Sequence, residues 1–136
     1  MRHRHHHHRL GRATGPRKAL LRQLAAQVIL QGMVETTHAK AKAVAGVVDS
    51  LAHLATTGRG HREIRAIMRR LPSGAMGESA SRRLYERVES ATADTGFVRV
   101  LRTRRRLGDG AEMARVAFTN IVVAPPKEKE EDPDES

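Results

Sequence analysis

The sequence predicts an α+β domain with two layers, in which about four helices cover a small sheet. Apolar residues recur at helical spacing in four segments, two later segments alternate as strands do, and glycine or proline separates the segments. The length of 136 residues fits one folded domain. We place this domain at residues 16–123, between a basic arm at 1–15 and an acidic tail at 124–136.

Each predicted helix has a recognisable start or stop. The four segments are 16–31, 37–54, 61–71 and 78–91. Pro16 is favoured at the first position of a helix, and Gly32 ends this first one. Thr37 is a suitable N-cap for the second helix, and Pro72 stops the third. Every segment carries an apolar stripe, so all four helices are expected to pack against a common core.

The strands are predicted from alternation and turn residues. Residues 97–103 and 113–122 alternate β-branched or apolar residues with polar ones, and Gly108-Asp109-Gly110 between them is a turn signal. These two segments therefore predict an antiparallel hairpin. Residues 33–36 are too short for a helix and are predicted to form a further strand.

Charge is distributed unevenly along the chain. There are 25 Lys and Arg residues against 15 Asp and Glu, which gives a formal net charge of +10. Residues 1–23 carry seven basic side chains and no acidic one, whereas residues 127–136 carry six acids and two bases. The arm has too few apolar groups to order itself, and the tail has the composition of a solvated extension.

Composition and motifs exclude several classes of protein. Cysteine is absent, so disulfides, thiol catalysis and cysteine-ligated zinc are excluded. No run of 18 apolar residues is present, and the N-terminus lacks the apolar segment of a secretion signal. Phosphate-binding loops, zinc-protease motifs and serine-hydrolase motifs are also absent. We expect no enzymatic activity, no cofactor, no membrane partner and no small-molecule substrate.

The carboxylates offer no clear acid–base pair. Glu86 and Glu89 lie three residues apart, but the arginines around them predict ion pairs on the surface of a helix. These arginines are Arg82, Arg83 and Arg87. Asp109 falls in the glycine turn, where aspartate is common because its side chain bonds the nearby backbone.

Histidines 5–8, with His3 nearby, form the most distinctive run in the arm. Neutral imidazole binds zinc, copper or nickel, so one interpretation is a metal-binding tract. A defined metal site also needs fixed ligand geometry, which an extended arm does not supply. We favour a polar, partly protonated segment that lies on phosphates, and expect no metal. The remaining histidines are predicted at the surface or at helix ends: His38, His53 and His61.

Basic residues form three groups: the arm, the hairpin around residues 99–106, and the helix around residues 59–70. Arginine accounts for 20 of the 25 basic residues, and its planar guanidinium matches the geometry of phosphate. Tryptophan is absent, and the only aromatic rings are Tyr85, Phe97 and Phe118, too few for a stacking platform that binds single strands. The sequence therefore predicts a partner of folded RNA, recognised by its shape and phosphates.

Three segments resemble the bacterial ribosomal protein L17 family of the large subunit. The first comprises residues 1–4 (MRHR), 9–12 (RLGR) and 17–22 (RKALLR). The second is residues 35–42 (ETTHAKAK), and the third runs from residues 96–102 (GFVRVLR) to 108–114 (GDGAEMA). Their order and spacing agree with the family over about residues 1–123. The family's Gly-Arg-Lys near the start is replaced here by the histidine tract.

The resemblance implies a structural ribosomal protein without a catalytic role. Such a protein binds large-subunit RNA near the exit of the peptide tunnel and contacts neighbouring ribosomal proteins. The resemblance also implies a sheet of three strands, which supports the strand predicted at residues 33–36. Because Met1 coincides with the start of the family, we expect no transit peptide, and we expect the protein in the bacterial cytoplasm as part of the ribosome.

We expect the arm to thread between RNA helices while the domain presents a basic face. The RNA-binding residues predicted in the arm and first helix are Arg2, His3, Arg4, Arg9, Arg12, Arg17, Lys18 and Arg22. Those predicted on the domain are Lys40, Lys42, Arg99, Arg102, Arg104, Arg105 and Arg106. One alternative is a nucleoid-type protein that coats or bends DNA, and another is a metal carrier that uses the histidine tract. The tail is interpreted as a solvated extension, with a phosphate mimic that covers the basic surface as the alternative.

Overall fold

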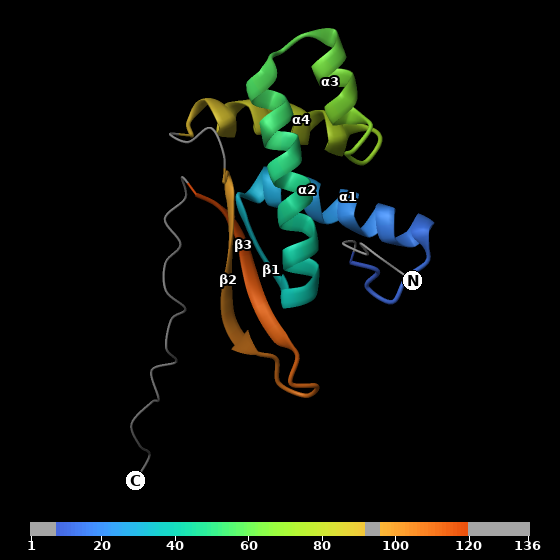
Figure 1. The fold of residues 1–136 in the computed structure, drawn as a ribbon, viewed down its shortest axis with the longest axis vertical. Helices are drawn as coiled ribbons and strands as arrows, with labels where there is room; N and C mark the ends of the chain where they lie inside the picture. Colours follow the sequence, from blue (N-terminus) through green and yellow to red (C-terminus); the bar gives the residue numbers. More distant parts are fainter. Residues whose placement is uncertain (1–7, 92–95, 120–136) are drawn as a thin grey trace, which may run out of the picture.

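The structure is a computed structural model that describes residues 8–91 and 96–119 (Figure 1). Its helices are α1 Thr14–Gln31, α2 His38–Thr57, α3 His61–Met68 and α4 Ala75–Glu89. Its strands are β1 Met33–Thr37, β2 Val98–Arg105 and β3 Glu112–Phe118. Four helices and a three-stranded antiparallel sheet in the described ranges confirm the predicted α+β class. The division into arm, domain and tail stays a prediction, because residues 1–7 and 120–136 lie outside these ranges.

β3 is the central strand of the sheet and pairs antiparallel with both β1 and β2. The hairpin of β2 and β3 confirms the sequence prediction. The strand predicted at residues 33–36 is also confirmed, and it occupies the other edge with Val34 opposite Val116. Sequence reasoning does not give this second pairing, because three helices separate β1 from the hairpin.

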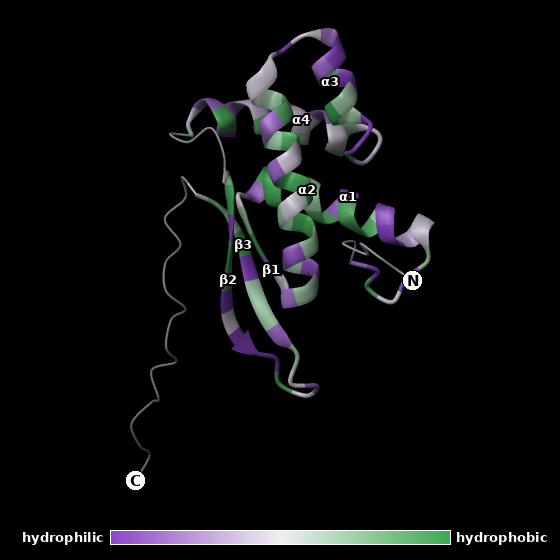
Figure 2. Ribbon diagram, in the orientation of Figure 1, coloured by the Kyte–Doolittle hydropathy of each residue, from purple (hydrophilic) through white to green (hydrophobic). Residues whose placement is uncertain are grey.

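Helix α2 packs on one face of the sheet, and α1 and α4 pack against α2 (Figure 1). Val44, Val48 and Leu51 of α2 are fully buried, and they meet Val116 and Phe118 in the core. Figure 2 shows hydrophobic residues gathered where α1, α2 and the sheet meet, whereas the far end of β2 is largely hydrophilic. Within the described ranges, no helix combines the length and apolar character needed to cross a lipid bilayer.

The first two helices differ slightly from their predicted bounds, and α2 ends at Thr57, three residues later than predicted. α1 begins at Thr14, so Pro16 occupies the third helical position and the prediction of the first position is wrong. The missing N–H of Pro16 is still harmless, because the first bond within the helix is donated by Arg17 to the carbonyl of Ala13. Thr37 is the N-cap residue of α2, as predicted, although its side chain makes no capping hydrogen bond among the described residues.

The connection from α3 to α4 lies three residues earlier in the chain than predicted, at residues 69–74 instead of 72–77. α3 ends at Met68 instead of Leu71, because the N–H groups of Arg70 and Leu71 bond carbonyls three residues back and tighten the chain into a turn. α4 begins at Ala75 instead of Glu78, directly after a glycine with φ of 84°. β3 ends at Phe118, and the predicted extension over residues 120–122 lies outside the described residues.

Arg87 is the clearest correction to the sequence prediction, because it is buried and only 8% exposed. Its Nε donates to the carbonyl of Ile29 at 2.5 Å, and its Nη2 donates to that of Leu30 at 3.1 Å. Both carbonyls belong to the last turn of α1, which lacks donors of its own. The guanidinium also lies 5.2 Å from the centroid of the Phe118 ring. Burial lowers the pKa of Arg87 below its usual value, and the charge of Arg83 adds to this effect. Arg87 thus connects α4, α1 and β3.

Candidate nucleic-acid interface

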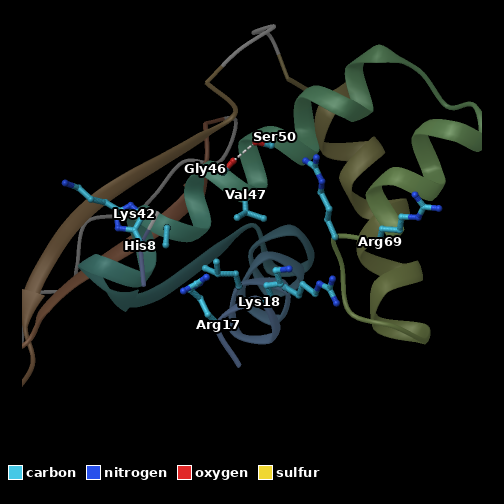
Figure 3. Close-up of a pocket in the computed structure, with 12 residues that line it drawn as sticks. His8, Arg17, Lys18, Lys42, Gly46, Val47, Ser50 and Arg69 are labelled. Carbon is cyan, nitrogen blue, oxygen red and sulfur yellow. Dashed lines mark hydrogen bonds between the residues drawn. The ribbon is translucent and has the colours of Figure 1, made fainter. Parts of the chain in front are cut away.

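A groove of about 600 Å³ lies between α1, α2 and the turn after α3. Figure 3 shows lining side chains from these three segments, with Val47 of α2 on the side of Arg17 and Lys18 of α1. Six cations line the groove: Arg17, Lys18, Arg22, Lys42, Arg69 and Arg70. The structure therefore brings together four of the predicted RNA-binding residues, three from α1 and one from α2.

Arg69 and Arg70 are site residues that the sequence analysis did not include among the RNA-binding set. They belong to its third basic group, whose position relative to α1 depends on tertiary packing. Because α3 ends at Met68, the two arginines fall in the turn that follows it. That turn lies beside α2, and both arginines line the groove.

Two further depressions each share one lining residue with the groove. At the start of α1, one depression is lined by Arg9, Arg12 and Arg17, and so shares Arg17 with the groove. Along α3, the other is lined by Arg62, Arg65 and Arg69, and so shares Arg69. We call the cations of the groove and these two depressions together the cationic track; its members are Arg9, Arg12, Arg17, Lys18, Arg22, Lys42, Arg62, Arg65, Arg69 and Arg70. Among the described residues, no Asp or Glu lines it.

The ion pairs found among residues 8–91 and 96–119 all lie away from the cationic track. They are Arg59–Glu89 at 3.1 Å, Arg83–Glu86 at 2.6 Å, Arg104–Glu35 at 3.3 Å, Arg106–Asp109 at 2.5 Å and Arg115–Glu35 at 3.6 Å. The pairing on the helix surface predicted for Glu86 is confirmed by Arg83, whereas Glu89 pairs with Arg59 from the connection between α2 and α3 and not with an arginine of its own helix. Because no acidic side chain of the described residues pairs with its cations, the track keeps a positive field.

The basic residues of the hairpin do not gather on one face. Arg99 lies opposite Ala117 and Arg102 opposite Ala114, so the two side chains leave opposite faces of the sheet. Arg102 is on the side of α2, 3.4 Å from Nε2 of His38. Arg104 already holds Glu35, and Arg105 is paired in register with Glu112. Lys40 lies half-buried in the first turn of α2.

Arg106 serves the turn of the hairpin. Its Nε and Nη2 donate to the two carboxylate oxygens of Asp109, at 3.1 and 2.5 Å. Asp109 also accepts a hydrogen bond from the backbone N–H of Ala111 at 3.2 Å. The hydrogen bond from Arg106, followed by that from the backbone, holds the pKa of Asp109 well below its usual value. The backbone role predicted for Asp109 is confirmed, and Arg106 is already occupied.

Residues 20–119 match the sequence pattern of the family described as Ribosomal protein L17. The chain belongs to the ribosomal protein L17 family. It is 41% identical to "Large ribosomal subunit protein bL17" of Gemmatimonas aurantiaca over 119 residues, which cover 85% of this chain and 96% of the relative. It is 37% identical to the protein of the same name from Campylobacter lari, with 87% and 98% covered. For the Halalkalibacterium halodurans protein, also of this name, identity is 39%, with 78% and 92% covered.

Membership of the L17 family confirms the resemblance and the prediction that this is a structural ribosomal protein and not an enzyme. The matched residues include the part of the groove that α2 and the turn after α3 provide. Arg2, His3 and Arg4, which are predicted to bind RNA, lie outside the described residues, as do histidines 5–7. Their roles stay predictions.

The described histidines lie at the surface or at helix ends. His53 and His61 are exposed, and His38 is the first residue of α2. His8 lines both the groove and a smaller pocket beside His38. In residues 8–91 and 96–119, no group of three or more His, Cys, Asp or Glu side chains could hold a metal. The only part of the tract that the structure places is thus His8, beside cations of the groove.

Proposed function

We propose that this protein is a constituent of the large ribosomal subunit in bacteria and binds ribosomal RNA through the cationic track. The names of its relatives support a place in the large subunit. The cationic track carries the proposal for RNA, because its charges have no acidic partners among the described residues. Phosphates of a folded RNA supply the missing partners, and guanidinium groups bind them through two parallel hydrogen bonds.

The arm continues the cationic track towards the N-terminus, because Arg9 and Arg12 already belong to it. We propose that Arg2, His3 and Arg4 extend these contacts between RNA helices. Ordering a chain costs about 1–2 kcal/mol per residue, so the arm becomes ordered only when RNA provides charge-assisted contacts. The family resemblance supports a position near the exit of the peptide tunnel, next to other ribosomal proteins. Crosslinks from the arm to RNA and proteins around that exit in purified subunits are the test.

We expect the affinity for ribosomal RNA to fall steeply with salt. If about seven phosphates are neutralised, a double-logarithmic plot of the association constant against salt has a slope of about −5 to −6. The measurement is a series of titrations with large-subunit RNA at increasing potassium chloride. A slope shallower than about −2 contradicts binding through the cationic track.

We expect arginines of the cationic track to contribute more to RNA affinity than arginines that form ion pairs elsewhere on the surface. Replacing Arg69 and Arg70 together by glutamine weakens binding of large-subunit RNA about 30-fold, because each lost phosphate contact is worth about 1 kcal/mol. The matched control replaces Arg59 and Arg83, which hold Glu89 and Glu86, by glutamine. An equal loss in both double variants shows that net charge alone, and not the track, governs binding.

Competition separates ribosomal RNA from DNA as the natural partner. At fixed salt, unlabelled random duplex DNA should displace labelled large-subunit RNA only at a large excess of phosphate. Equal displacement by DNA and RNA favours the nucleoid-type alternative. Sedimentation of the tagged protein with large subunits in a cell extract checks the assembly directly.

A further inference from the structure

The floor of the groove differs chemically from its rim. Leu21 of α1 and Ala43 and Val47 of α2 line the groove between the cations. Leu21 and Val47 are half-buried, so each keeps part of its surface open to the groove. Contact with apolar side chains does not stabilise a bound phosphate, but it does stabilise the face of a bound nucleobase. The floor therefore points to a ligand with a flat apolar part beside its charges.

Gly46 also supports a ligand with a flat apolar part on the floor. It lies in the interior of α2, where glycine is about 1 kcal/mol less favourable than alanine. A Cβ at this position would meet no atom within 4 Å, and Gly46 is not among the glycines with positive φ. Neither packing nor backbone conformation requires glycine here. The missing side chain leaves open space in the groove that Gly46 itself lines.

We infer that the groove binds one unstacked nucleotide of a folded RNA, with the base on the floor and the flanking phosphates on the rim. This inference rests on the proposed function and names the part of the RNA that the groove accepts. In a duplex the bases stay stacked and paired, so the floor would meet only water. Loops and bulges supply bases that are free to turn outwards.

None of the described residues that line the groove is Phe, Tyr or Trp, and this fits a site for a single base. A platform for several stacked bases needs several rings, but one base can lie between aliphatic side chains and a guanidinium plane. Arg17, Arg22 and Arg69 stand around the floor and can supply that plane. The volume of about 600 Å³ falls in the range of about 300–1,000 Å³ that is usual for small-molecule sites, which accommodates one nucleotide.

The test fills the floor without removing a charge. The full chain is titrated with a labelled single-stranded RNA of about 12 nucleotides, with the matching RNA duplex, and with the same strand carrying abasic sites. Gly46→Leu places an aliphatic side chain on the floor. Gly46→Ala is the small control, and Gly15→Leu adds the same side chain in α1 outside the groove, where a Cβ also meets no atom within 4 Å. Circular dichroism confirms that each variant is folded.

We expect Gly46→Leu to weaken binding of the single strand about tenfold and to leave duplex binding within about twofold. Gly46→Ala and Gly15→Leu should stay close to wild type. The abasic strand should bind wild type as weakly as the normal strand binds Gly46→Leu, and Gly46→Leu should not weaken it further.

The other outcomes overturn the inference in distinguishable ways. Equal weakening of single strand and duplex means that the groove holds duplex backbone, and no weakening means that the floor is unused; the proposed function survives both. A glutamate-rich peptide is added as a competitor. If Gly46→Leu weakens binding of this peptide and leaves RNA binding unchanged, the occupant is an acidic protein segment. If wild type binds neither short RNA but still binds large-subunit RNA, only the inference fails; if it binds none of the three, the proposed function fails as well.

Discussion

Replacing Arg87 by methionine is expected to lower the free energy of unfolding by about 2–4 kcal/mol. Methionine keeps much of the apolar stem of arginine but provides no donor. The carbonyls of Ile29 and Leu30 then lose the hydrogen bonds that close the end of α1. The negative end of the α1 dipole also loses the positive charge placed against it.

Thermal denaturation followed by circular dichroism measures this effect. For a domain of this size, a loss of about 2–4 kcal/mol lowers the melting temperature by about 10–20 °C. Arg83→Met is the matched control on the same helix, because its exposed pair with Glu86 contributes less than about 1 kcal/mol. Equal losses in the two variants would show that Arg87 stabilises the fold no more than a surface arginine does.

Replacing Gly77 by alanine is expected to destabilise the fold by about 2–3 kcal/mol. A Cβ at this position would lie 1.9 Å from the carbonyl oxygen of Pro72 and 3.1 Å from its carbonyl carbon. Both are backbone atoms, so the clash is relieved only if α4 moves away from the connection that precedes it. The intrinsic preference of helices for alanine, which favours the change by up to about 1 kcal/mol, is too small to compensate.

Gly15→Ala is the matched control, because Gly15 also lies in the first turn of a helix but has open space around it. This change is expected to leave stability unchanged or to raise it by up to about 1 kcal/mol. Urea unfolding of the two variants gives opposite shifts of the midpoint if the contact with Pro72 is decisive. Shifts of the same sign would mean that the connection adapts to the extra methyl group.

The sequence predicted the elements of this fold better than their pairing. Long apolar stripes identify α1 and α2, and alternation identifies the hairpin, because each pattern is local. The predicted end of α3 at Leu71 is wrong because the apolar pattern continues beyond the helix. Leu71 follows Ile67 at helical spacing and is indeed buried, so the apolar pattern continues although the backbone has already turned. The antiparallel pairing of β1 with β3 depends on how the helices between them fold.

For the candidate site, the residues that sequence reasoning chose best are those in an acid-free segment. Arg17, Lys18 and Arg22 have no nearby acid in the chain, and they line the groove. Arg104 looked equally free, but the pairing of β1 with β3 brings Glu35 to it from a distant segment. Tertiary packing likewise decides the position of Arg69 and Arg70. Such contacts are outside the reach of local patterns.

The position of Arg87 on the apolar stripe of α4 indicates burial, although the charges around it favour a place on the surface. It lies three residues after Leu84, and Leu84 itself follows Ala80 on the apolar stripe of α4. A cation at a stripe position predicts burial with a partner, because burying an unpaired charge is costly. The surrounding arginines and glutamates obscured this position.

The order of strands also determines when the sheet can form during synthesis. β3 is the last described strand to leave a translating ribosome, yet it is the only hydrogen-bonding partner of both β1 and β2 in the described sheet. A nascent chain without it therefore exposes two unpaired strands and the apolar side of α2 that covers them. The protein completes its sheet only when nearly all of its described residues have been made.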